Sequence, residues 1–152
     1  MATFPDIVTT RRDVDSPLDE ALFLDFYNRD EGLSEHPFFL AFTEVSTTAT
    51  SFTTLATFKL YIPVAAVRLV CAFQAKTVLG TGSYQWIIGA LTSDTKTTTS
   101  ATYVDTLRCT FADVTSVRGT EVTLELQVKN SGVNLTYAKQ TDGPACRFLA
   151  VS

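Results

Sequence analysis

Few side chains in this sequence have the type and spacing that enzyme chemistry requires. A hydrolase of the serine or cysteine kind needs a nucleophile, a base and an orienting acid, and the base is usually histidine. His36 is the only histidine, and it lies in Glu35-His36-Pro37, away from any Gly-x-Ser-x-Gly motif. We therefore expect no catalytic residue of this kind.

The acidic residues offer two further kinds of site, and both are poorly supported. A calcium loop counted from Asp13 would need a glycine at its sixth position and a glutamate at its twelfth, and the sequence has neither. A glycosidase needs two carboxylates in one cleft. The available carboxylates fall on outward strand positions or beside turns, where solvated charges belong: Asp105, Asp113, Glu121 and Glu125.

The three cysteines do not form a metal or disulfide pattern. Cys71, Cys109 and Cys146 are far apart, include no Cys-x-x-Cys pair, and are odd in number. Each falls among alternating apolar residues. We expect reduced thiols that pack in the core, and neither a metal nor a cofactor.

Aromatic side chains could form a carbohydrate-binding platform, which is the main alternative to a purely structural role. Trp86 is the central candidate, but it shares its strand face with Tyr84, Ile88 and Ala90, so core packing is the favoured interpretation. The other candidates are Tyr84, Tyr61 and Tyr103.

Residues 37–152 have the period of two that is typical of half-buried strands. The clearest case is 121–129, where Val122, Leu124, Leu126 and Val128 alternate with polar residues. Turn-rich pieces separate about eight such segments, which predicts a mainly β, antiparallel sandwich of the jelly-roll kind. The expected strands are 38–45, 51–62, 65–76, 83–92, 105–112, 121–129, 133–138 and 145–151, and the Thr-rich run 95–102 is expected to be a polar connection or an edge strand.

The first 36 residues have a different character. Pro5 and the absence of apolar periodicity predict an extended arm over residues 1–15. Ser16 is a suitable N-cap and Pro17 suits the first turn of a short amphipathic helix, so residues 16–36 are expected to be an anchoring helix and linker. The apolar positions of this helix are Leu18, Ala21, Leu22 and Phe26.

Charge separates the same two regions. Residues 1–36 carry nine acidic and three basic side chains, a net charge of −6, whereas the remainder has a net charge of +2. The weakly positive remainder has no clustered basic stripe, so nucleic acid is not an expected partner. The most apolar stretch, residues 62–75, is shorter than the roughly 20 residues of a spanning helix and contains Arg68, so no membrane association is expected.

Two stretches resemble parts of tailed-bacteriophage virion proteins. Residues 9–30 (TTRRDVDSPLDEALFLDFYNRD) look like an N-terminal element in which a Ser-Pro-Leu segment opens a helix that docks on the particle. The segment 121–133 (EVTLELQVKNSGV) with the C-terminal FLAVS is similar to the closing strands of phage jelly-roll domains that trimerise. The resemblance implies docking through Arg11, Arg12, Asp13, Asp15, Ser16, Pro17, Leu18, Leu22 and Phe26.

The leading hypothesis is a non-enzymatic virion component, made in the host bacterial cytoplasm, whose arm and helix dock on the capsid, neck or tail. The sandwich would project outwards or form a homo-oligomer, with a trimer favoured. The resemblance leaves the component open among head spike, collar, capsid decoration and tail periphery. The rival hypothesis is a carbohydrate- or receptor-binding sandwich module.

Overall fold

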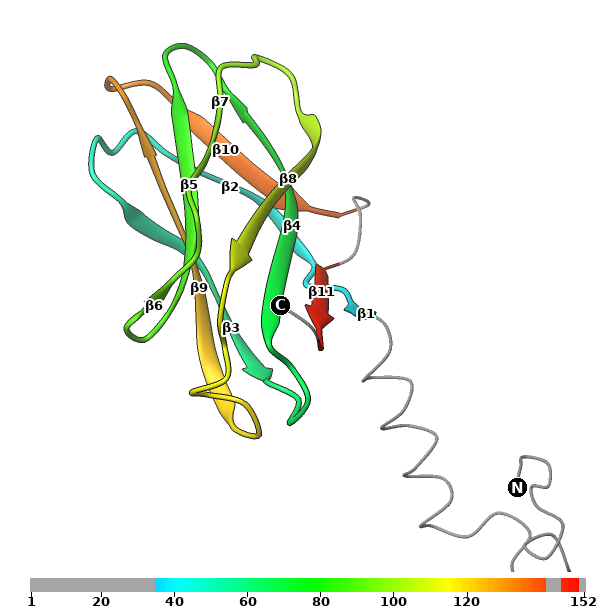
Figure 1. Cartoon of the computed structure of the whole chain (residues 1–152). Coiled ribbons are helices and arrows are strands. Elements are labelled where there is room, and N and C mark those ends of the chain that lie inside the picture. The colour runs from blue at the N-terminus through cyan, green and yellow to red at the C-terminus, as the bar shows by residue number, and fades with distance from the viewer. Residues whose placement is uncertain (1–34, 142–145, 151–152) are drawn as a thin grey trace, which may run out of the picture. The chain divides into compact units, whose positions relative to one another are not determined.

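The computed structural model describes residues 35–141 and 146–150, and all regular structure within them is β (Figure 1). The expected arm over 1–15 and the expected helix lie outside the described residues. Contacts divide the chain between residues 34 and 35. The first strand, β1 (Glu35–Phe38), begins two residues before the expected start of the sandwich.

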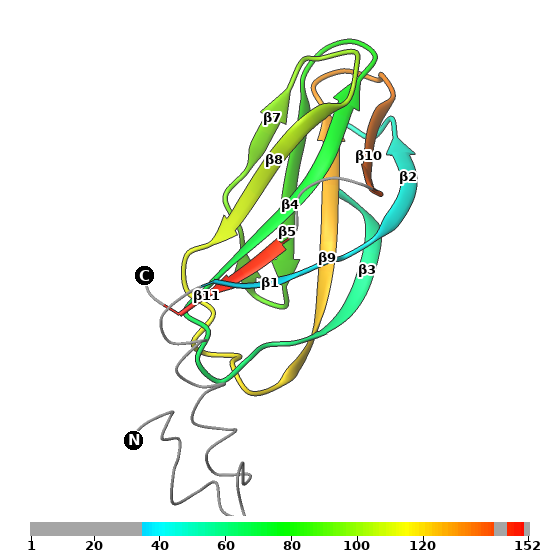
Figure 2. The ribbon, with the colours of Figure 1, turned by 90° about the vertical axis from the view of Figure 1, so that its right-hand side faces the viewer.

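The strands form two antiparallel sheets that pack face to face (Figures 1 and 2). In the first sheet, the long central strand β4 pairs with β8 on one side. On its other side it pairs with β11 and β10, which lie end to end, and these pair in turn with β1 and β2. The strands are β2 (Phe42–Thr47), β4 (Arg68–Thr77), β8 (Val104–Phe111), β10 (Thr136–Gln140) and β11 (Cys146–Leu149).

The second sheet has two neighbouring central strands, β9 and β5. The edge strand β3 pairs with β9, and the short strands β6 and β7 pair with successive parts of β5. The strands are β3 (Thr53–Tyr61), β5 (Gly82–Ile88), β6 (Leu91–Thr92), β7 (Lys96–Thr98) and β9 (Glu121–Asn130).

The pairing of the strands is nested. If β1/β2, β6/β7 and β10/β11 are each counted as one interrupted strand, the described chain has eight strands. The first then pairs with the eighth, the second with the seventh, the third with the sixth and the fourth with the fifth. The chain therefore resembles one long hairpin that has been folded over into two sheets.

Most differences between the expected and the observed strands arise where an expected strand is interrupted. The strand expected over 83–92 is a hairpin, because the chain turns at Gly89, where φ is +56°. The strand expected over 38–45 is divided into β1 and β2. The Thr-rich run 95–102 contains β7, an edge strand, as one of its two interpretations predicted.

The core confirms the alternation predicted for residues 121–129. Leu124, Leu126 and Val128 are fully buried, and Glu121 is exposed. Trp86 is also fully buried, as core packing predicted. Its ring centroid lies 5.9 to 6.4 Å from those of Phe73, Phe58 and Phe42, so one aromatic cluster joins the two sheets.

The central strand β4 departs from the expected alternation, because both of its faces are buried. Val70, Ala72 and Gln74 belong to the outward set, yet they are only 5%, 1% and 9% exposed. Val70 lies directly opposite Arg147, and Ala72 lies directly opposite Arg108. Long aliphatic stems on neighbouring strands can cover small side chains of this kind.

Candidate functional site

The docking residues predicted from the sequence, which run from Arg11 to Phe26, all lie outside the described residues. On the sandwich itself, three surface regions differ from an ordinary polar surface.

The first region is one end of the sandwich, where four connections meet (Figures 1 and 2). These connections are residues 48–52, 78–81, 99–103 and 131–135, and none of them contains a charged side chain. We call this region the charge-free end. It carries four aliphatic side chains that are 39% to 78% exposed: Val78, Leu79, Val133 and Leu135.

Sequence reasoning missed this region, for two reasons. It placed Val133 and Leu135 in a strand over 133–138, but β10 begins only at Thr136, so both side chains lie in the preceding connection. It also gave Val78 and Leu79 no role, although an aliphatic pair directly before the turn at Gly80 was a usable signal.

Hydrogen bonds hold the charge-free end in place. The side-chain amide of Asn130 is buried, and it donates to Thr77 Oγ1 at 2.8 Å and to Thr136 Oγ1 at 2.6 Å. Its carbonyl oxygen accepts from the Gly132 N–H at 2.8 Å. The backbone of Val78 donates to the Leu135 carbonyl at 2.9 Å. The two connections that carry the aliphatic side chains are therefore fixed to one another.

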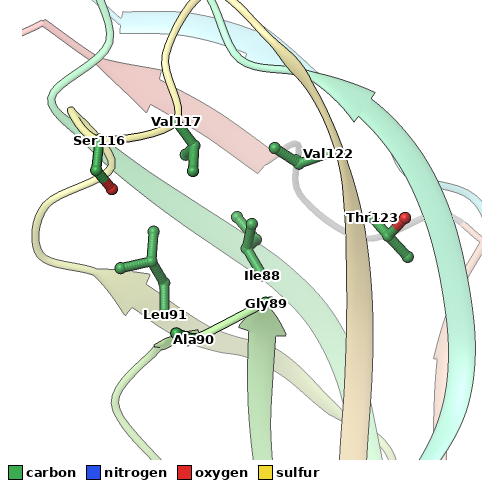
Figure 3. Close-up of a pocket in the computed structure, with 8 residues that line it drawn as sticks. All are labelled: Ile88, Gly89, Ala90, Leu91, Ser116, Val117, Val122 and Thr123. Carbon is green, nitrogen blue, oxygen red and sulfur yellow. The ribbon is translucent and has the colours of Figure 1, made fainter.

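The second region is an apolar depression of about 470 Å³ between the β5–β6 turn and the chain that leads into β9 (Figure 3). No titratable side chain lines it, so it offers space for an apolar group and no means of acid–base chemistry. Its polar groups are hydroxyls, and that of Thr123 accepts a hydrogen bond from Lys59 Nζ at 3.0 Å. The lining residues are Ile88, Gly89, Ala90, Leu91, Ser116, Val117, Val122 and Thr123.

The third region is a cluster of lysines and tyrosines formed by β2, β4, β10 and the connection that precedes β8. Lys76 Nζ lies 4.7 Å from the ring centroid of Tyr103 and 4.8 Å from that of Tyr137, and Lys139 Nζ lies 4.5 Å from that of Tyr103. The Tyr103 hydroxyl donates to the Glu44 carboxylate. Partial burial and this carboxylate raise the pKa of Tyr103, so the phenol keeps its proton.

The aromatic residues proposed as a sugar platform do not form one exposed surface. Tyr84 and Trp86 are buried, and the Tyr84 hydroxyl donates to the backbone carbonyls of Lys76 and Tyr137. Tyr61 is exposed at the end of β3, whereas Tyr103 lies in a connection of the charge-free end. Cations already contact the Tyr103 ring, so stacking of a sugar on it would compete with Lys76 and Lys139.

Two of the carboxylates considered for catalysis have hydrogen-bond partners on the surface of the sandwich. Glu125 accepts a hydrogen bond from the Thr54 hydroxyl at 3.0 Å on the outer face of β9. Asp113 accepts from the hydroxyl and backbone N–H of Thr115, and these bonds hold the pKa of this exposed carboxyl below its usual value. Within residues 35–141 and 146–150, no group of three or more His, Cys, Asp or Glu residues is arranged to hold a metal ion.

The cysteines lie where the alternation predicted. Cys71, Cys109 and Cys146 are free and fully buried, and each is on an inward position. No helix in the described part of the chain combines the length and apolar character that crossing a bilayer would require.

Comparisons with known proteins add no further constraint on function. No family model matches the chain, and no curated protein matches it.

Proposed function

We propose that this protein is a non-enzymatic structural component of a tailed-phage virion and that its sandwich is a jelly roll. The observation that carries the proposal is the nested pairing of eight strands in two sheets, which is the pairing of a jelly roll. Jelly rolls are used by viral capsid proteins, lectins and cupins. The resemblance of residues 9–30 and 121–133 to phage virion proteins favours the first of these classes.

The layout of the sandwich supports a division between attachment and projection. β2 runs towards the charge-free end, and β1 precedes it, so the described chain begins at the opposite end (Figure 2). In the proposal, the arm and helix of residues 1–36 dock on the capsid, neck or tail, and the sandwich projects outwards. Three copies would associate through their sandwiches.

Deletion of residues 1–30 tests the attachment role. The truncated protein should remain folded, with an unchanged urea midpoint, but should no longer be incorporated into particles in a complementation assay. The matched point variants are Leu22→Asp and Phe26→Asp on the apolar face of the expected helix, with Asn28→Asp as the control on its other face. Normal incorporation of the truncated protein would refute the proposal.

A receptor- or carbohydrate-binding module is the second candidate, and the exposed aliphatic side chains of the charge-free end favour it. Size-exclusion chromatography with light scattering separates the two candidates. A trimer or a larger closed ring supports the virion component. A monomer whose glycan binding is lost in Leu79→Ser or Val133→Ser supports the module.

A further inference from the structure

The three buried thiols lie in one row across three neighbouring strands of the first sheet. Cys71 on β4 lies directly opposite Cys109 on β8. On the other side of β4, Arg147 lies opposite Val70, which places Cys146 beside Cys71 at the start of β11. Cys71 is therefore flanked by a thiol on each side.

The two neighbours of Cys71 are not equivalent. The thiols of Cys71 and Cys146 lie close enough that each contributes to the pKa shift of the other. The Cys109 thiol instead points to the second sheet, where it lies 3.6 Å from the Tyr84 carbonyl oxygen, to which it donates. Facing residues on adjacent antiparallel strands have Cα atoms roughly 4.5 to 5.5 Å apart, within the roughly 4.4 to 6.8 Å that a disulfide spans. Both neighbours of Cys71 meet this spacing, but the Cys109 thiol is turned towards Tyr84, which leaves Cys146 as the partner for a bond.

The interruption between β10 and β11 gives Cys146 a particular environment. At this point Ala72 on β4 bonds to side chains: its N–H donates to Cys146 Sγ at 3.4 Å, and its carbonyl accepts from Gln140 Nε2 at 2.5 Å. The hydrogen bond from Cys71 and those from the backbone of Ala72 and Leu40 lower the pKa of Cys146. Burial raises the pKa of Cys71. Of the two thiols, Cys146 is the one whose surroundings favour the thiolate, which is the nucleophilic form.

We propose that Cys71 and Cys146 form an oxidation site, at which a peroxide converts the two thiols into a disulfide that joins β4 to β11. The Cys146 sulfur attacks one oxygen of the peroxide and breaks the O–O bond, which yields a sulfenic acid and one water. The Cys71 sulfur then attacks the Cys146 sulfur and releases the second water. The two thiols lose two protons and two electrons, the peroxide is reduced to two waters, and Cys109 remains a thiol.

The disulfide would stabilise the position of the first and last strands of the first sheet. β11 has four residues and pairs with both β1 and β4, so a covalent link to β4 holds the last strand and, through it, the first. The protein would have thiols in a reducing compartment and a disulfide in an oxidising one. This inference needs only the thiol row, and it stands whether or not the proposed function is correct.

The test treats the full-length folded protein with hydrogen peroxide and then alkylates it in denaturant. Wild-type protein and the matched control Cys109→Ala should each lose two alkylatable thiols and become lighter by two hydrogen atoms. Digestion should yield one peptide pair that joins Cys71 to Cys146, and the oxidised protein should unfold at a higher urea concentration than the reduced protein. Dithiothreitol should reverse both changes.

Two further variants identify the order of the steps. Cys71→Ala should stop at a sulfenic acid on Cys146 that dimedone traps. Cys146→Ser, which keeps an acceptor for the Ala72 N–H, should give no disulfide and retain both remaining thiols. The proposal is overturned by a Cys71–Cys109 peptide, by a disulfide between molecules, or by three intact thiols at a peroxide dose that oxidises the unfolded chain.

Discussion

The strands β4 and β9 have the same length and comparable positions but differ in their outer faces. Each has ten residues, and each lies between neighbours on both sides of its sheet. Along β9, buried side chains alternate with partly exposed ones from Leu124 to Asn130. Along β4, residues 69 to 75 are buried without interruption.

The difference lies in the side chains on the neighbouring strands. Glu125 and Thr123 on the outer face of β9 are polar and reach Thr54 and Lys59 by hydrogen bonds. The outward residues of β4 include the small side chains of Val70 and Ala72, and arginines lie directly opposite both. Alternation in a sequence therefore identifies the inward set, whereas the exposure of the outward set depends on the neighbours.

The inward faces of the two strands should respond alike, and these variants should have the largest effects. Phe73→Ala on β4 and Leu126→Ala on β9 each remove a fully buried side chain. We expect losses of about 3 to 5 and about 2 to 5 kcal/mol in the free energy of unfolding, because each leaves a cavity between the sheets. Urea denaturation measures both, and a loss below about 1 kcal/mol for either would show that its site is not part of the packed core.

The outward faces should respond differently, which tests the comparison directly. Ala72→Leu on β4 should cost about 1 to 3 kcal/mol, because the outer face has no room for extra methylene groups. The matched change Thr123→Leu on β9 should stay within about 0.5 kcal/mol. Equal midpoints for the two variants in a urea series would remove the distinction between the strands.

The close contact between the ends of β4 and β9 can be tested by replacing a glycine. Gly80 follows β4 and has a φ of +79°, and a Cβ there would lie 2.9 Å from Asn130 Oδ1, at the end of β9. Gly80→Ala should therefore cost about 2 kcal/mol, from the left-handed backbone and the close contact. Gly89→Ala is the control, because its φ is also positive but no atom lies within 4 Å, and it should cost about 1 kcal/mol. Thermal unfolding compares them, and a larger loss at Gly89 would contradict the close contact at Gly80.

The acidic residues on the outer face of β9 should have the smallest effect. Glu121→Gln and Glu125→Gln keep the size of the side chain and remove only its charge, so each should change stability by no more than about 0.5 kcal/mol. The same urea series measures them. Losses as large as that of Leu126→Ala would mean that this face is covered by a partner.

Much of the fold could be predicted from the sequence, because side-chain period depends on local residues. The mainly β, antiparallel arrangement, the buried set of Leu124, Leu126 and Val128, and the core positions of the three cysteines and Trp86 are confirmed. The break between β1 and β2 was not predicted, since the run of apolar residues continues across it. The hairpin at Gly89 was also missed, although a glycine there was a usable signal.

Pairing and surface features needed the three-dimensional structure. A period of two does not specify which strand lies beside which, so neither the nested order nor the row of thiols could be read from the sequence. Val133 and Leu135 are exposed because β10 begins only at Thr136. The predicted strand began three residues earlier, at residue 133, so the prediction did not show that these two side chains are exposed. The charge asymmetry of residues 1–36 was visible in the sequence, but those residues lie outside the described part except for Glu35 and His36.

The nested pairing also has a consequence for how the chain is made. The fourth and fifth strands are joined by a short turn, so the β5–β6 hairpin can close while later strands are still being synthesised. β1 and β2 emerge first from the ribosome, yet their partners β11 and β10 emerge last. Long-range pairing of this kind slows folding. β1 and β2 therefore stay unpaired while nearly all of the described strands are synthesised. We expect the first sheet to close only after β11 has been synthesised.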